Sequence, residues 1–357
     1  MIFGSSILAT IITTFIFAFM AIKFFKPVAI EVGLVDKPTE RKQHAGHIPL
    51  IGGISIFIAV LMASLLWLPN TLELRMYLIA SAMMVFIGAL DDKFDLKVRI
   101  RIIGQLIVAS LMIYGVGGYI SNLGNLFGLG DVTLGPVGII FTYVGIIVVI
   151  NAFNMVDGID GLIGSLSLNT FTAIAILFLI NSNHTYLSYP LILATAILPY
   201  MMFNLDLFDK HSKKIFMGDA GSMFIGLSVI WLLSIGTQGD NASFRPVTAL
   251  WICGVPLMDM LAIVIRRYRK GKSPFKPDRD HLHHIFMRVG LNDKQTLLFI
   301  TLLAVLMSLI GVLGEVYSVP EYIMFGLFLV SFLIYSFTIK HICKVFNYIN
   351  TLVKANR

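Results

Sequence analysis

A twelve-residue segment, NAFNMVDGIDGL at 151–162, carries four oxygen-bearing side chains and no basic residue. Three of these side chains recur every three residues and share one face of a helix, and two glycines then permit a turn toward the fourth. Hard oxygen donors suit Mg²⁺ or Mn²⁺ with a phosphate substrate, whereas thiolate or imidazole ligands would indicate zinc or copper. The segment therefore predicts divalent-metal phosphate chemistry, carried by Asn151, Asn154, Asp157 and Asp160.

Further acidic residues lie within or beside apolar runs. Asp91 and Asp92 directly follow the run MMVFIGAL. Adjacent carboxylates repel each other unless a cation or a proton lies between them, which suits Mg²⁺ binding or general-base catalysis; a hydrated helix end is the alternative. Asp219, in FMGDAGS, begins an apolar segment, where an acid serves either as a simple helix cap or in a phosphate site. Asp259 lies inside another apolar segment, where a carboxylate serves either as a structural polar contact or as part of the lining of a cavity.

The loop 266–295 combines nine Lys or Arg residues with three histidines in four positions. Its basic side chains, Arg279 among them, suit pyrophosphate or anionic lipid headgroups. Because no Cys and no HExxH pattern accompanies the histidines, we favour phosphate contact over zinc binding for His281, His283 and His284.

The composition indicates a membrane-embedded scaffold. Of 357 residues, 57% are hydrophobic and only 13% are charged, about half the charged fraction of a soluble domain. The net charge of +7 is attributed to membrane topology rather than to nucleic acid, because the basic residues fall in short loops between apolar segments. Cys253 and Cys343 lie on apolar segments and are interpreted as small apolar side chains.

Eleven segments are apolar and long enough to cross a hydrocarbon core of about 30 Å. We therefore expect an all-α polytopic integral membrane protein, a single domain over residues 1–357 with about 11 transmembrane helices. The predicted spans are 5–25, 48–67, 74–91, 100–118, 137–153, 161–181, 187–205, 218–237, 247–267, 296–316 and 321–342.

The basic residues predict an orientation. One of the two alternating sets of loops holds 25 of the 27 Lys and Arg residues, so the positive-inside rule makes that set cytoplasmic. The N-terminus is then expected to be periplasmic and the C-terminus cytoplasmic. An active site on the cytoplasmic face would be built from the loops 26–47, 91–100, 154–161, 206–219 and 266–295.

The order of these motifs resembles that of the polyprenyl-phosphate N-acetylhexosamine-1-phosphate transferases of glycosyltransferase family 4, over nearly the whole chain. Within this superfamily the chain is most similar to the bacterial branch that uses undecaprenyl phosphate and UDP-GlcNAc. The resemblance is carried by GLVDKP (33–38), RKxHxGxIPLxGG (41–53), FIGALDD (86–92), NAFNMVDGIDGL (151–162), IFMGDAGS (215–222), PVTALW (246–251), PLMDM (256–260) and SPFxPDRxHxHH (273–284).

This resemblance implies transfer of GlcNAc-1-phosphate from UDP-GlcNAc to undecaprenyl phosphate, with release of UMP. It implies Mg²⁺ as cofactor, which Mn²⁺ replaces, and a multi-pass protein of the bacterial inner membrane. The lipid product would begin O-antigen or enterobacterial common antigen synthesis, a part of lipopolysaccharide biosynthesis. The partners are then both substrates and the lipid bilayer, without nucleic acid; a homodimer is left open.

The resemblance also implies residue roles. The metal ligands implied are Asp219 and Asn154. The catalytic acids implied are Asp91, Asp92, Asp157 and Asp160. The substrate-binding residues implied are Asn151, Asp160, Phe216, Arg279, His281, His283 and His284. The pentapeptide-transferase branch has a lysine where this chain has Asp95, which argues against a pentapeptide substrate.

Two alternatives stay open on the sequence. One alternative is a sister transferase that uses another UDP-N-acetylhexosamine. It stays open because the sequence does not identify the residues that line the sugar pocket. A secondary transporter also combines many spans with intramembrane carboxylates, but its polar sites should lie near the midplane and recur in two halves. Here the acidic clusters gather on one predicted side.

Overall fold

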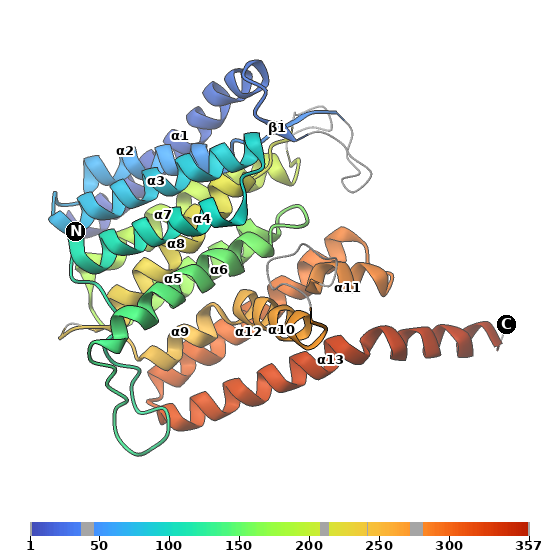
Figure 1. The fold of residues 1–357 in the computed structure, drawn as a ribbon. Coiled ribbons are helices and arrows are strands. Elements are labelled where there is room, and N and C mark those ends of the chain that lie inside the picture. Colours follow the sequence, from blue (N-terminus) through green and yellow to red (C-terminus); the bar gives the residue numbers. More distant parts are fainter. Residues whose placement is uncertain (1, 37–45, 208–213, 241, 272–280, 356–357) are drawn as a thin grey trace.

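The apolar segments fold as helices in the computed structural model, which describes residues 2–36, 46–207, 214–240, 242–271 and 281–355. Figure 1 shows them as a bundle with the N-terminus and the C-terminus on opposite sides. The elements are α1 (Ile2–Glu31), β1 (Val35–Asp36), β2 (Ile48–Pro49), α2 (Gly52–Trp67), α3 (Leu72–Phe94), α4 (Val98–Ser110), the π-helical turn η1 (Leu111–Gly115), α5 (Val137–Met155), α6 (Leu162–Ile180), α7 (His184–Asn204), α8 (Gly218–Thr237), α9 (Pro246–Ile252), α10 (Gly254–Arg269), α11 (Leu282–Arg288), α12 (Asp293–Val316) and α13 (Glu321–Ala355).

The all-helical, polytopic class is confirmed. In the part of the chain that the structure describes, nine helices are long and apolar enough to cross a membrane, or ten if α9 and α10 count as one span. The prediction of eleven also included α2, which has only 16 residues. The predicted ninth span is broken, because α9 and α10 meet at 81° around Cys253. Pro256 lacks an amide donor for the helix ladder just after this break.

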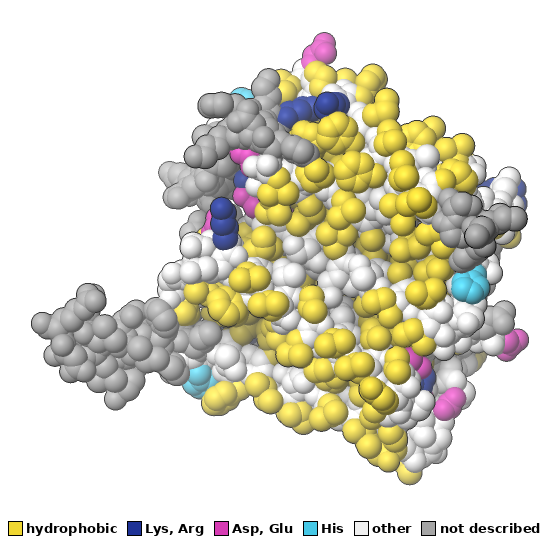
Figure 2. All heavy atoms as spheres, turned by 180° about the vertical axis from the view of Figure 1, so that it is seen from behind, with side chains coloured by type: hydrophobic (Ala, Val, Ile, Leu, Met, Phe, Trp, Pro, Cys, Tyr) yellow, Lys and Arg dark blue, Asp and Glu magenta, His cyan; other side chains and the backbone are white. Residues whose placement is uncertain are grey.

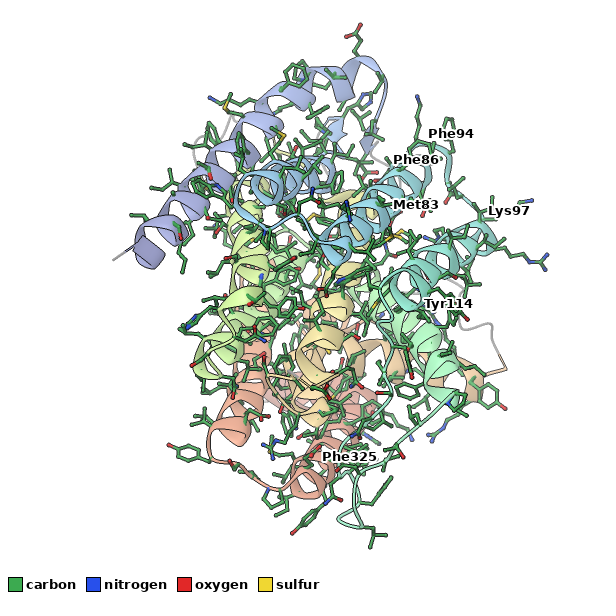
Figure 3. The ribbon with its side chains drawn as sticks, turned by 90° about the vertical axis from the view of Figure 1, so that its left-hand side faces the viewer. Met83, Phe86, Phe94, Lys97, Tyr114 and Phe325 are labelled. Atoms are coloured by element: carbon green, nitrogen blue, oxygen red, sulfur yellow. The ribbon has the colours of Figure 1, made fainter. Side chains whose placement is uncertain are left out.

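The outer surface of the bundle is apolar. In Figure 2 hydrophobic side chains cover the middle of one face, while charged side chains lie toward its edges. Phe86 and Phe94 of α3 and Tyr114 of η1 point outward, each more than half exposed (Figure 3). A belt of exposed apolar side chains is expected where lipid, rather than water, surrounds a helical bundle.

Helix α8 is the buried centre of the bundle, and nearly all of its side chains are inaccessible. Small residues let its neighbours approach closely. A Cβ at Gly53 of α2 would overlap the backbone of Gly221, and a Cβ at Gly88 of α3 would overlap the backbone of Ala220. Such small-residue contacts favour helix packing in membranes. They hold the first turn of α8 firmly against α2 and α3.

Candidate active site

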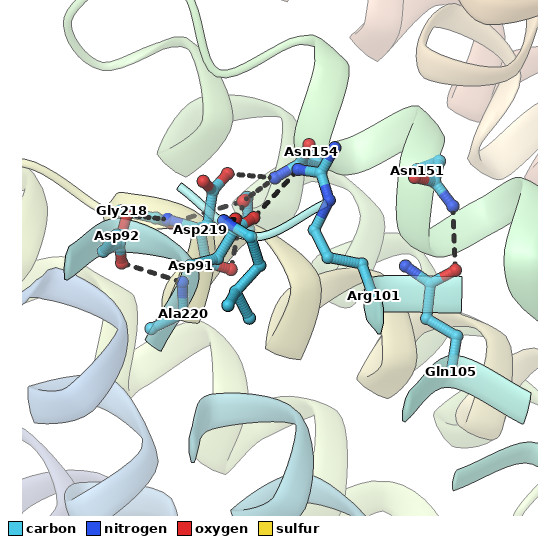
Figure 4. Close-up of polar contacts among 11 residues, drawn as sticks. Asp91, Asp92, Arg101, Gln105, Asn151, Asn154, Gly218, Asp219 and Ala220 are labelled. Atoms are coloured by element: carbon cyan, nitrogen blue, oxygen red, sulfur yellow. Dashed lines mark hydrogen bonds and ion pairs between the residues drawn. The ribbon is translucent and has the colours of Figure 1, made fainter. Parts of the chain in front are cut away.

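The N-terminus of α8 is capped by a carboxylate from another helix. Asp92, near the end of α3, accepts hydrogen bonds from the backbone N–H groups of Asp219 (2.8 Å) and Ala220 (3.1 Å), as Figure 4 shows. Free N–H groups and the helix dipole both favour a negative charge at this place. Asp92 therefore fixes the position and direction of the turn that carries Asp219.

Asp219 is also held from α5. The side-chain amide of Asn154 donates to the Asp219 carboxylate at 2.5 Å and to the hydroxyl of Ser222 at 2.9 Å. Its Nδ2 thus bonds to two side chains of α8 that lie about one turn apart. The structure brings together the two residues that the sequence predicted as metal ligands (Figure 4).

Asp91 faces a different neighbour from Asp92. Its carboxylate pairs with the guanidinium of Arg101 at 2.9 Å and accepts from the backbone N–H of Leu96 at 2.8 Å. The Asp91 side chain is almost fully buried, whereas Arg101 is 26% exposed. The two adjacent carboxylates therefore need no shared cation, because each has partners of its own.

The segment that leads into α8 is extended and joins a small sheet. β1 pairs antiparallel with β2, and the backbone of Phe216 bonds on either side to Pro49 and Gly52 (both 2.9 Å). The IPLxGG motif thereby supplies a backbone template that holds the FMGDAGS motif in register. These hydrogen bonds position Phe216 three residues before Asp219.

A second group of predicted residues meets around Lys214. Its ammonium group forms an ion pair with Asp160 and lies 5.5 Å from the ring centre of Phe216. Buried Asn204 connects the two segments involved, since it accepts from the N–H of Gly161 (2.6 Å) and donates to the carbonyl of Ile215 (2.9 Å). The end of NAFNMVDGIDGL and the start of FMGDAGS are thus tied together.

The histidine cluster lies against the same motif. The rings of His281 and His283 are stacked at 5.7 Å, and a Cβ at Gly158 would overlap the imidazole of His283. Burial lowers the pKa of His283 to about 3, and the neighbouring rings of His284 and His281 add to this effect. His283 is therefore neutral at physiological pH and contributes a polar ring rather than a charge.

The glycine at 158 makes a testable prediction. Gly158→Ala should lower the activity of the site at least about tenfold, because it would displace the ring of His283, a predicted phosphate contact, and a shift of even 1 Å has effects of this order or larger. The rate is measured in membranes normalised to the amount of protein. Gly145→Ala, also at a glycine of α5 or its loop, meets only one side-chain atom at 3.8 Å and should keep full activity. Equal rates for the two variants would show that activity does not depend on the position of the His283 ring.

Not every predicted residue joins this group. Asn151 lies a turn deeper in α5 and donates to buried Gln105 (3.0 Å) and to the carbonyl of Ile147 (2.7 Å), apart from Asp219 in Figure 4. Asp157 follows α5 directly and is partly buried. Arg279 lies outside the described residues.

Four residues of this region were not singled out by the sequence: Arg101, Gln105, Asn204 and Lys214. Lys214 could have been found, since residues i and i+2 of an extended segment share a face and Phe216 lies two positions on. Asn204 carried no such signal, because a single asparagine at the end of an apolar helix is common. Its two hydrogen bonds become visible only once the chain is folded.

The oxygen donors at the head of α8 fit a magnesium ion. Among the residues that the structure describes, no three His, Cys, Asp or Glu side chains converge into a ready-made metal site. Mg²⁺ does not need one, since it is commonly held by one or two carboxylates together with substrate phosphates and water. The carboxylate of Asp219 and the side-chain carbonyl of Asn154 are donors of this kind.

The fold and site are those of a helical membrane protein with carboxylate, amide and histidine side chains gathered at one end of the bundle. A family model described as glycosyl transferase family 4 matches residues 74–237, and with relatives about 45% identical over 97% of its length the chain belongs to this family of transferases.

Relatives are similar over almost the full length. The undecaprenyl-phosphate alpha-N-acetylglucosaminyl 1-phosphate transferase of Yersinia pestis is 44% identical, over 97% of this chain and 95% of its own. The proteins of the same name from Escherichia coli strain K12 and Pasteurella multocida are each 45% identical over 97% of this chain, and over 95% and 97% of their own.

Proposed function

We propose that this protein transfers GlcNAc-1-phosphate from UDP-GlcNAc to undecaprenyl phosphate. An oxygen of the lipid phosphate attacks the β-phosphorus of the donor, the P–O bond to the α-phosphate breaks, and UMP leaves. The observation that carries this proposal is the meeting of Asn154, Asp92 and Asp219 at the head of α8, in a chain about 45% identical to transferases so named. We propose direct attack by the lipid, since one preassembled site suffices for a single displacement.

Asp219 and Asn154 would hold Mg²⁺ or Mn²⁺. When bound, such an ion neutralises the charge that develops on the donor's pyrophosphate. Asp92 acts on the same place indirectly, because it holds the N–H groups of Asp219 and Ala220 and so orients the Asp219 carboxylate. The side chain of Asp157, two residues after the end of α5, would add a further carboxylate to this side of the site.

The nucleotide would lie beside Phe216 and Asp160. The exposed part of the Phe216 ring offers a stacking surface for uracil, and Lys214 neutralises Asp160 at its edge. His281, directly before α11, and His283 and His284, in its first turn, would contact the phosphates together with Arg279. Asn151 would support α5 through Gln105.

The lipid phosphate would lie beside Asp91 and Asp92. Arg101 is the cation best placed to receive it, because only one of its guanidinium nitrogens is bonded to Asp91 and the side chain is partly exposed. We therefore propose that Arg101 makes the phosphate contact that Asp95 cannot make.

The chain would cross the bacterial inner membrane eleven times as one domain, with α2 and the bent pair α9/α10 completing the count. The N-terminus would be periplasmic, and the site would open to the cytoplasm, where UDP-GlcNAc is made. Support comes from the loop charge, with 25 of 27 basic residues in one of the two alternating sets of loops, and from the N- and C-termini, which lie on opposite sides of the bundle in Figure 1.

The test is a product assay in membranes that contain the protein. Radiolabelled UDP-GlcNAc should yield UMP and a lipid-linked sugar only when undecaprenyl phosphate and a divalent ion are both present, and EDTA should abolish the product. UDP-GalNAc in a parallel reaction tests the sister-transferase alternative. Release of UDP in place of UMP, or full activity in EDTA, would exclude the proposed reaction.

A further inference from the structure

A carboxylate is buried in the broken span, away from the head of α8. Asp259 of α10 is only 1% exposed, although a charged group inside a membrane protein is costly unless it has partners. Its Oδ1 accepts from the backbone N–H of Leu282 (3.0 Å) and from the hydroxyl of Tyr335 (2.8 Å). Its Oδ2 lies 3.0 Å from the Nδ1 of His281.

These contacts join three distant parts of the chain. Leu282 begins α11, Tyr335 belongs to α13, and Asp259 lies in α10, after the 81° bend between α9 and α10. Helices α10, α11 and α13 lie close together in Figure 1. The break in the ninth span brings this part of α10 to the histidine loop. All three contacts are made to the Asp259 carboxylate, and one of them comes from His281, the residue before α11, whose ring is stacked on His283.

We propose that Asp259 is a positioning residue that holds the His281 imidazole with its Nδ1 protonated and its Nε2 directed at the phosphates of the substrates. This inference rests on the proposed function and deepens it. A carboxylate only accepts hydrogen bonds, so the His281 nitrogen that faces it must carry the proton. The carboxylate thereby fixes the tautomer and orientation of the ring, and Nε2 is left as an acceptor for the hydrogen of a protonated phosphate oxygen.

The two hydrogen bonds to Oδ1 make the orientation of an amide at this position predictable. In Asp259→Asn the amide oxygen must stay where Leu282 and Tyr335 donate, because an NH₂ group there would meet two donors. The NH₂ group then faces His281 and donates to Nδ1. This forces the ring proton to Nε2, so the nitrogen that faces the phosphates changes from an acceptor to a donor, with little change in side-chain shape.

The experiment is a double-mutant cycle on kcat in the membrane assay. Asp259→Asn should lower kcat about 100-fold, with the KM for UDP-GlcNAc unchanged within about threefold, as expected for the loss of a partner that orients a histidine. His281→Asn keeps a donor toward Asp259 but removes Nε2, and should cost about as much. The double variant should then be no worse than His281→Asn within about threefold, because Asp259 acts through this ring alone.

Tyr335→Phe is the matched control, since it removes one hydrogen bond from the same carboxylate without touching His281. It should keep kcat within about threefold of wild type. Losses that multiply to about 10,000-fold in the double variant would show that Asp259 acts independently of His281 and overturn the proposal. So would a Tyr335→Phe loss equal to that of Asp259→Asn, which would make the role structural. Inactive wild-type protein in the same assay would instead refute the proposed reaction.

Discussion

Asp219→Asn should reduce the rate of UMP release by about 10³-fold, while the protein still inserts into the membrane. The substitution keeps the shape of the side chain, and its amide oxygen can still accept from Asn154. What it removes is the negative charge at the head of α8. Loss of a charged group that binds a catalytic cation or stabilises developing charge typically costs two to three powers of ten, roughly 3–4 kcal/mol in the barrier.

The matched control for this variant is Asp293→Asn. Asp293 is also the acidic residue in the first turn of a long helix, α12, but it is exposed and lies outside the proposed site. Its neutralisation should change the rate less than twofold, because a helix-dipole contact on the surface contributes only about 0.3–1 kcal/mol to stability. Rates are measured at saturating Mg²⁺ and again over a metal titration. Near-normal turnover of Asp219→Asn would remove this residue from the metal site.

The helical scaffold could be predicted because its signal is strong and local. Each apolar segment of about 20 residues must satisfy its backbone hydrogen bonds internally, so it can only be a helix. The bend at Cys253 left no such signal, because the residues around it, WICGVPLM, are as apolar as a straight span. The contacts of α10 with α11 and α13 depend on this bend, so they could not be predicted from the hydropathy of the sequence.

The sequence predicted which residues belong to the candidate site better than it predicted which of them contact one another. Asp91 and Asp92 are neighbours in sequence, which suggested a shared cation. Successive residues of a helix point about 100° apart, so the two carboxylates face different helices. The partner of Asp92 lies 127 residues farther along the chain. A capping contact of this range depends on how α3 and α8 pack, and no spacing rule within one helix describes it.

A related expectation concerns the glycine directly before Asp219. Gly218→Ala should lower the rate of UMP release about 100-fold, a larger effect than the loss of backbone freedom alone would explain. Gly218 has φ of +73°, a left-handed conformation that costs an L-residue about 1–2 kcal/mol. Its added Cβ would also lie 2.5 Å from an oxygen of Asp92. The Asp92 carboxylate would have to withdraw from the N–H groups of Asp219 and Ala220, and the turn proposed to bind the metal would lose these two hydrogen bonds.

Gly33→Ala separates the two causes. Gly33 also has φ of +73°, but nothing lies within 4 Å of the position where its Cβ would stand. This variant bears the conformational cost alone, so it should lower the melting temperature by less than Gly218→Ala does, while the rate falls less than about threefold. The difference between the two rates then measures the contact with Asp92. If both variants were equally active, the cap that Asp92 forms on α8 would be irrelevant to turnover, and the position of Asp219 would have to depend on Asn154 alone.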